Sequence, residues 1–232
     1  MALEEYRRKR RFGVTTEPPG GPRLRRRTRQ LRFVIQKHRA TRLHYDFRLE
    51  WDGVLLSWAV PKGPSLDPTI KRLAMAVEDH PIEYARFEGV IPAGEYGGGT
   101  VMIWDYGTYV SDEPDVGKSV AKGEIKFALA GTKLGGSWVL VRTRGRYGGD
   151  RSWLLIKHRD EAASTIDVAT AAPRSVVSDR LLAEIAFEEG GDVRQAVSAD
   201  PRAAVEAALR DPRTAKRKPK RAPAVWHSKQ PQ

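Results

Sequence analysis

The chain has 232 residues, of which 40% are hydrophobic and none is cysteine. This composition supports the packed core of one sizeable domain and excludes disulfides, thiolate metal sites and cysteine nucleophiles, so any metal must have nitrogen and oxygen ligands. The formal net charge of +12 is concentrated at the two ends, because residues 1–32 contain 11 Lys and Arg against 3 acids, and residues 210–232 contain 8 against 1.

Residues 1–30 are predicted to form a flexible basic arm, since they are rich in arginine and contain the turn-forming run EPPGGPR. With the basic C-terminal end, such an arm usually binds a polyanion, most often nucleic acid; the alternative is a pair of solvated tails. No apolar stretch follows the first charges, and no apolar run approaches the ~18 residues of a membrane span. We therefore expect a cytoplasmic, nucleoid-associated protein without a membrane partner.

Residues 31–160 are predicted to form an all-β core. Eight short runs rich in β-branched and aromatic residues are separated by Gly, Pro or Asp: LRFVIQKH, LHYDFRLEW, VLLSWAV, RLAMAVED, TVMIWDYGTYV, GEIKFALAG, GSWVLVRTR and SWLLIKHR. This density of strands favours a barrel or a sandwich. Asp52-Gly53, between two of the runs, is a strong signal for a tight hairpin. The glycines of EYGGGT, which lacks the lysine and following helix of a phosphate-binding loop, predict a second hairpin.

Residues 161–232 are predicted to form a basic extension that is partly helical and then disordered. A helix is expected over residues 178–190, with Ser178 as N-cap, apolar residues at helical spacing and Gly190 at the end. The alanine-rich run DPRAAVEAALRD predicts a second short helix, and the lysine-rich end predicts disorder.

The run QKHRATRLHYDF holds two of the chain's five histidines. His44 and Asp46 share one face of a strand, as does Arg48. His38 lies six residues before His44, about 20 Å away in one continuous strand, so both can reach one ion only if the chain reverses within RATR. Such a reversal would place two imidazoles and a carboxylate on one face, a set that suits Mn²⁺, Zn²⁺ or Co²⁺. The alternative is a polar, solvent-facing row on a sheet.

Further polar residues around this run are of the kinds that bind a phosphate beside a metal. VEDHPIEY supplies His80 and Tyr84, Arg72 follows Lys71 just before another run, and Lys62 lies in a Pro/Gly loop. Arginine gives bidentate contacts to phosphate oxygens, and histidine can protonate a leaving group. Each residue taken singly also has a structural explanation, as a cap, a buried ring or a surface cation.

Three long segments carry a resemblance to a known family: RFVIQKHRATRLHYDFRLEWDGVLLSWAVPKGPS, KRLAMAVEDHPIEYARFEGVIPAGEYGGGTVMIWDYGTY and SWLLIKHRD. Over roughly residues 5–160 the chain resembles the 3′-phosphoesterase domain of the ATP-dependent DNA ligase D of bacterial end joining, in its freestanding form. The resemblance implies a compact, mainly antiparallel β-barrel of about eight strands with minor flanking helices. It also implies a divalent-metal enzyme, usually active with manganese, that removes 3′-phosphates and trims 3′-terminal ribonucleotides to leave a 3′-OH.

The resemblance assigns roles to residues of this sequence. The metal ligands match His38, His44 and Asp46, and the catalytic group matches Arg48, His80 and Tyr84. Supporting positions that bind phosphate or substrate match Lys62, Arg72, Gln36, Arg10 and Glu17. The acidic residue that often follows the motif arginine is Arg11 here, which weakens the expectation of ribonucleotide trimming. The implied partners are DNA 3′ ends, and with them Ku and a DNA ligase or polymerase; the protein is expected to be a monomer.

Two other functions compete with this interpretation. A nucleotidyltransferase needs a lysine nucleophile two residues before Asp-Gly, and Glu50 stands at that position, where a carboxylate cannot form the lysyl–nucleotide adduct. A non-catalytic scaffold that binds DNA ends is the second alternative, and metal-dependent turnover distinguishes it from an enzyme.

Overall fold

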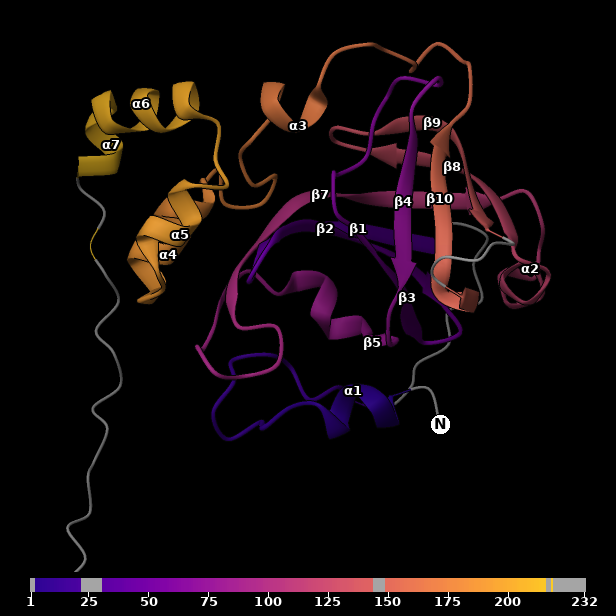
Figure 1. Ribbon diagram of the computed structural model, residues 1–232, viewed down its shortest axis with the longest axis horizontal. Helices are drawn as coiled ribbons and strands as arrows, with labels where there is room; N and C mark the ends of the chain where they lie inside the picture. The colour runs from indigo at the N-terminus through magenta and orange to yellow at the C-terminus, as the bar shows by residue number, and fades with distance from the viewer. Residues whose placement is uncertain (1–2, 22–30, 144–148, 216–217, 219–232) are drawn as a thin grey trace, which may run out of the picture.

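The computed structural model describes residues 3–21, 31–143, 149–215 and 218 (Figure 1). Eight antiparallel strands close into a barrel in the order β1-β2-β3-β4-β10-β9-β8-β7, because β7 pairs back with β1. Their bounds are β1 Leu31–Arg39, β2 Leu43–Trp51, β3 Val54–Val60, β4 Lys71–Ala76, β7 Gly99–Ser111, β8 Glu124–Gly131, β9 Gly135–Arg142 and β10 Ser152–Lys157. The predicted all-β fold is confirmed as a barrel, and each of the eight predicted runs is one of its strands.

Both predicted hairpins form. Asp52 and Gly53 have φ of 47° and 79°, as a two-residue turn with both central residues in the left-handed region requires, and Trp51 pairs with Val54 across it. The glycine-rich run connects the short strand β6, Gly89–Ile91, to β7 in antiparallel pairing. Another short strand, β5 (His80–Pro81), pairs with β3 and was not predicted.

The barrel interior is filled by alternate residues of its strands. Phe47 of β2 packs between Phe33 and Phe127, with ring centroids 6.4 and 5.7 Å away, and Trp104, Trp138 and Trp153 are fully buried. Burial of each large apolar side chain contributes roughly 1.5–3 kcal/mol. A second apolar cluster lies on the outer face of β1, β3 and β7, and it includes Tyr6, Val34, Leu55, Tyr84 and Ile103. The polar residues of β1 and β2 that alternate with the interior residues therefore lie on a covered face.

The cover over this outer face comes from the N-terminal segment, residues 3–21, and from the 3-10 helix η1, Ile82–Arg86 (Figure 1). The prediction of one flexible arm over residues 1–30 is wrong for this part of it. Residues 4–8 form helix α1 (Glu4–Arg8), Tyr6 is fully buried, and its hydroxyl donates to the Pro18 carbonyl at 2.6 Å. The arginine-rich composition suggested a solvated arm, but Lys9 and Arg10 of this segment pair with the buried carboxylate of Glu78. Residues 22–30 lie outside the described residues.

The remaining helices are α2 Val116–Lys122, η2 Gly149–Arg151, α3 Val168–Ala171, α4 Leu182–Glu189, α5 Val193–Val197, α6 Arg202–Arg210 and α7 Pro212–Ala215. The two predicted helices are confirmed as α4 and α6, with Gly190 ending α4 in the left-handed region. Ser178 as N-cap is wrong: the N-cap is Leu181, and the Ser178 hydroxyl instead pairs with the buried carboxylate of Glu88. The C-terminal end, for which disorder is predicted, lies almost entirely outside the described residues. The division into arm, core and extension stays a prediction.

The C-terminal extension packs on the barrel: α4 contacts β6 and β7, and a buried ion pair joins Asp200 to Lys37 of β1 at 3.0 Å. The second carboxylate oxygen of Asp200 accepts from the Ala183 amide at 2.9 Å, which ties the pair to α4. None of the helices within the described ranges is long and apolar enough to cross a membrane.

Asp200→Asn should lower the free energy of unfolding by about 3 kcal/mol, because it leaves the Lys37 ammonium buried without its counter-charge. The double variant Lys37→Met/Asp200→Asn should regain most of that loss, since the buried charge is gone. Lys126→Ala, which breaks the exposed pair with Glu124, is the control and should cost at most about 1 kcal/mol. Urea denaturation measures all three; equal losses for the single and double variants would contradict the account.

Candidate metal and phosphate site

The β1–β2 hairpin brings the two predicted histidines together. The chain reverses between Arg39 and Leu43, which are paired residues, so that His38 lies directly opposite His44 with ring centroids 4.7 Å apart. The Asp46 carboxylate lies 3.8 Å from His38 Nδ1 and 3.7 Å from His44 Nε2. One ligand atom from each of the three residues falls within a 4.8 Å span. The predicted reversal is thus confirmed, and the three residues form a group that can hold a metal ion.

Hydrogen bonds orient both imidazoles toward Asp46. His38 Nε2 lies 2.8 Å from the Gly97 carbonyl and His44 Nδ1 lies 3.1 Å from the Arg42 carbonyl, so each of these nitrogens carries the proton and donates. The other nitrogen of each ring faces the carboxylate, and a hydrogen bond on one imidazole nitrogen is how proteins orient metal-ligating histidines. Metal–ligand bonds of about 2.0–2.2 Å would separate such atoms by about 3–4 Å, close to the distances found here. The donor set therefore fits a divalent transition metal.

Arg48 connects three polar side chains of the site. Its guanidinium donates to the Asp46 carboxylate at 2.9 Å, to Gln36 Oε1 at 2.8 Å and to the Ser57 hydroxyl at 2.8 Å. The residue is only 2% exposed. Burial raises the pKa of Asp46, but the charge of Arg48 and the contacts with both histidines lower it further, so the carboxyl stays ionised well below its usual range. The alternative of a solvent-facing row does not hold, because Asp46 and Arg48 are buried and His44 is half-buried.

Gln36 holds Arg48 in place from the side of η1. Its amide donates to the carbonyls of Tyr84 and Phe87 at 3.0 and 2.8 Å while its oxygen accepts from Arg48. All the hydrogen-bonding groups of this fully buried amide are thus engaged within the protein. The structure gives Gln36 a positioning role, and direct contact with substrate stays a prediction.

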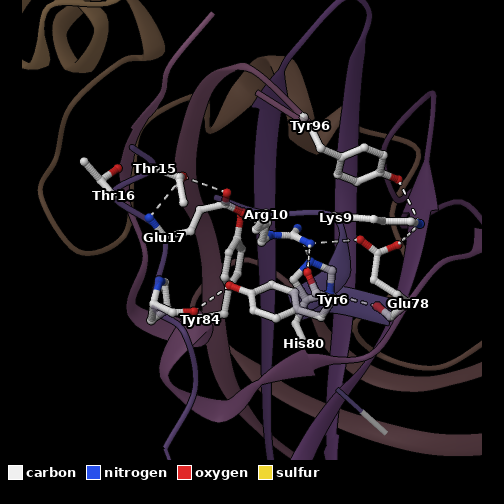
Figure 2. Close-up of polar contacts among 12 residues, drawn as sticks. Tyr6, Lys9, Arg10, Thr15, Thr16, Glu17, Glu78, His80, Tyr84 and Tyr96 are labelled. Atoms are coloured by element: carbon white, nitrogen blue, oxygen red, sulfur yellow. Dashed lines mark hydrogen bonds and ion pairs between the residues drawn. The ribbon is translucent and has the colours of Figure 1, made fainter. Parts of the chain in front are cut away.

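His80 and Tyr84 are both buried, and the Tyr84 ring lies 4.9 Å from the Arg48 guanidinium. Figure 2 shows both rings beside Arg10. His80 Nδ1 donates to the Glu78 carbonyl at 2.8 Å, and its Nε2 accepts from Arg10 at 3.1 Å. Burial, followed by the charges of Arg48 and Arg10, holds the pKa of His80 well below its ordinary value. Burial, followed by the Glu17 carboxylate, holds the pKa of Tyr84 well above its ordinary value, and the Tyr84 hydroxyl donates to Glu17 at 3.0 Å. Both side chains are therefore neutral at pH 7.

The N-terminal segment completes the site through Arg10 and Glu17 (Figure 2). Arg10 pairs with Glu17 at 2.7 Å and with Glu78 at 3.2 Å, and its guanidinium lies 3.9 Å from the centre of the Tyr6 ring. These contacts bring the two predicted N-terminal residues into the cluster around His80. Arg11, by contrast, is 72% exposed and pairs with Glu95 in the loop before β7.

Sequence reasoning missed Tyr6, Ser57 and Glu78. Glu78 accepts from Lys9 at 3.0 Å as well as from Arg10, and it lies two residues before His80. A buried arginine in the arm needs a buried carboxylate, but the sequence does not say which of the chain's 29 acids supplies it.

Lys62 and Arg72 are not brought to this cluster. Both line a separate pocket of about 480 Å³ that is also lined by Lys37, Tyr45 and Asp200. Tyr45 alternates with His44 and Asp46 along β2 and so points to the opposite face of the strand. The substrate-binding role of Lys62 and Arg72 stays a prediction.

On this barrel, a set of nitrogen and oxygen metal ligands lies beside a buried arginine. Such a site is suited to metal-dependent chemistry on phosphate esters. Comparison with known proteins agrees with chemistry on phosphate esters. Residues 36–142 match the model of the DNA Ligase D 3'-phosphoesterase domain. Those residues contain His38, His44, Asp46, Arg48, His80 and Tyr84. Residues 36–142 therefore correspond to a 3′-phosphoesterase domain of this family.

Similar proteins are longer chains. The multifunctional non-homologous end joining protein LigD of Pseudomonas aeruginosa is 52% identical over 184 residues, which cover 78% of this chain and 22% of that protein. The multifunctional non-homologous end joining DNA repair protein LigD of Mycobacterium tuberculosis is 52% identical over 117 residues, 49% of this chain and 15% of that protein. The chain therefore spans less than a quarter of the length of these relatives.

Low pH should weaken the docking of the N-terminal segment on the barrel, because it protonates the Glu78 carboxylate. Burial raises the pKa of Glu78, but the contacts with Lys9 and Arg10 lower it further, below its ordinary value of 4.5. Because the folded pKa is the lower one, these ion pairs stabilise the docked segment above pH 4.5 and lose that contribution as pH falls through the lowered value. Amide hydrogen exchange of residues 4–17, corrected for intrinsic rates and referred to β8, should show protection falling at acid pH.

Glu78→Gln should reduce that protection already at pH 7 and flatten its pH dependence. Glu5→Gln is the matched control, because exposed Glu5 also pairs with Lys9, at 2.8 Å. Equal protection in the wild type and Glu78→Gln at pH 7 would contradict the assigned role.

Proposed function

We propose that the chain is a divalent-metal-dependent phosphoesterase that heals the 3′ ends of DNA. It removes a 3′-phosphate, and trims a 3′-terminal ribonucleotide, to leave a 3′-OH for a polymerase or ligase. The observation that supports this most directly is the contact between Arg48 and Asp46. It joins a metal-ligand set to a phosphate-binding guanidinium in one hydrogen-bonded cluster.

The metal in this proposal is held by His38, His44 and Asp46, with Mn²⁺ as the favoured ion and Zn²⁺ or Co²⁺ as alternatives. When bound, such an ion supplies charge neutralisation at a phosphate oxygen and lowers the pKa of a coordinated water. Both histidines turn a ring nitrogen toward Asp46. Burial lowers the pKa of His44, although Asp46 opposes this, so the His44 ring is neutral and can bind a metal.

Arg48 binds the phosphate in the proposed reaction. Among the described residues, its three hydrogen bonds use three of the guanidinium's five N–H groups, and the remaining ones can meet phosphate oxygens. Because Gln36 and Ser57 already fix its plane, little ordering is needed as charge develops in the transition state. Arg10 is the second guanidinium of the cluster and can share its hydrogen bonds with the same phosphate.

His80 and Tyr84 act as neutral groups until substrate binds. A phosphate beside His80 would offset the positive charges of Arg48 and Arg10, raise the pKa of the imidazole and allow it to protonate the leaving 3′-oxygen. The Tyr84 hydroxyl orients the phosphate while Glu17 holds the phenol in place. Lys62 and Arg72, in their own pocket, would bind the DNA backbone.

The biological setting follows from the relatives. The Pseudomonas and Mycobacterium proteins are named as multifunctional end-joining proteins, and we propose that this chain serves the same repair process, on DNA ends and with Ku and a ligase or polymerase nearby. Its net charge of +12 favours binding to the DNA backbone without sequence readout.

A 5′-labelled primer–template that ends in a 3′-phosphate tests this proposal. With Mn²⁺ the wild type should convert it to a 3′-OH product, and chelation should abolish the conversion. His44→Ala should lower the rate by at least about 100-fold, since it removes a metal ligand. His158→Ala is the matched control, because this histidine bonds Ser137 at the end of β10 instead, and it should retain the wild-type rate.

A second primer with one 3′-terminal ribonucleotide tests the trimming activity in this Arg11-bearing chain. No conversion with any divalent metal, while salt-sensitive binding to the DNA end persists, would contradict the enzymatic proposal and favour a non-catalytic end-binding scaffold.

A further inference from the structure

The loop of residues 92–98, between β6 and β7, borders the metal-ligand set. Gly97 accepts the hydrogen bond of His38 through its carbonyl, and a side-chain carbon added at Gly97 would lie 3.6 Å from the His38 ring. Tyr96 is the residue immediately before it. The loop therefore fixes the place of one aromatic ring relative to the site.

The 92–98 loop is held by internal hydrogen bonds and by an ion pair. The Glu95 amide donates to the Pro92 carbonyl at 3.2 Å, and the Gly98 amide donates to the Glu95 carbonyl at 3.0 Å. The Glu95 carboxylate also pairs with Arg11 of the N-terminal segment. A ring carried by such a loop is held before any ligand arrives, so binding to it costs little ordering.

Tyr96 is exposed although its surroundings are ordered. It is 48% exposed, and its hydroxyl contacts the Lys9 ammonium at 3.3 Å (Figure 2). The same ammonium lies 4.7 Å from the ring centre, and the Arg10 guanidinium lies 5.6 Å from it. Arg10 in turn contacts His80 at 3.1 Å. An exposed ring, flanked by cations, thus stands at the border of the catalytic cluster.

We propose that Tyr96 is the stacking platform for the nucleobase of the 3′-terminal nucleotide, an inference that rests on the proposed function. Flat aromatic side chains next to cations are what single-stranded nucleic acid binds, because every base has a π-face and the neighbouring phosphates need positive charge. A terminal phosphate at Arg48 places its own nucleotide next to the site, where the 92–98 loop stands. Stacking on Tyr96 accepts any base, and an enzyme that acts on DNA ends of any sequence requires this.

A primer–template with 2-aminopurine as the 3′-terminal, 3′-phosphorylated nucleotide tests the proposal in chelator, without turnover. Titration with wild-type protein should change the 2-aminopurine fluorescence. Tyr96→Ala should weaken binding by about 5- to 100-fold and remove that change, whereas Tyr96→Phe, which keeps the ring, should bind within about 2-fold of the wild type. Phe187→Ala on α4 is the control, as its ring is similarly exposed at 45%.

A labelled primer with an abasic 3′-terminal nucleotide separates stacking from other roles of Tyr96. The wild type should bind it more weakly than the normal primer by the factor found for Tyr96→Ala, and Tyr96→Ala should lose nothing further. The same loss for Tyr96→Ala on the abasic and normal primers, or no loss on either, would overturn the proposal and leave Tyr96 as a surface contact of Lys9.

The experiments can reject the proposed enzyme activity and the proposed Tyr96 platform independently. Base-dependent binding through Tyr96 without hydrolysis of the 3′-phosphate would reject the enzyme and keep the platform. Normal hydrolysis by a protein in which Tyr96→Ala has no base-dependent effect would reject the platform alone.

Discussion

The ion pair between Arg48 and Asp46 is the interaction on which the site depends. A buried guanidinium is unfavourable unless it is paired and hydrogen-bonded, and Asp46, Gln36 and Ser57 provide three such contacts for Arg48. The pair fixes the Asp46 carboxylate between two histidines, and Gln36 connects the same guanidinium to η1, which carries Tyr84. One buried cation thereby sets the positions of the metal ligands and of the groups proposed to handle the phosphate.

The N-terminal segment extends this network and balances its charge. Lys9 and Arg10 arrive with Glu17 beside the barrel's Glu78, so the cluster gains as many carboxylates as cations. With Asp46 and Arg48 already paired, the covered site is near neutral before a ligand binds. A divalent cation and a phosphate dianion would enter it together at little net electrostatic cost, whereas either alone would leave an uncompensated charge in the covered site. This explains why the site can be buried and still suit ionic ligands.

Local pattern in the sequence predicted the strands and the core of the site. The eight strands follow from alternation, and the approach of His38 to His44 follows from one requirement, a reversal within Arg39–Arg42. The docked N-terminal segment could not be predicted in this way. Its partners, such as Glu78 for Arg10, are separated by 68 residues, and its arginine-rich composition resembles that of a solvated tail. The Leu181 cap was missed because Leu181 has no capping side chain, and its own backbone amide instead donates to the Glu184 carboxylate. Lys62 and Arg72 were grouped with the site by residue type and then by the family motif, and only the fold assigns them to another pocket.

We propose that His38, His44 and Asp46 bind one catalytic metal beside Arg48. Crystals of the protein grown with Mn²⁺ and inorganic phosphate test this directly, through anomalous diffraction at the manganese edge. We expect one strong anomalous peak within about 2.0–2.3 Å of His38 Nδ1, His44 Nε2 and an Asp46 oxygen, with a phosphate bound between the metal and Arg48. A fully occupied manganese site elsewhere, with the three side chains unchanged and no peak between them, would contradict it.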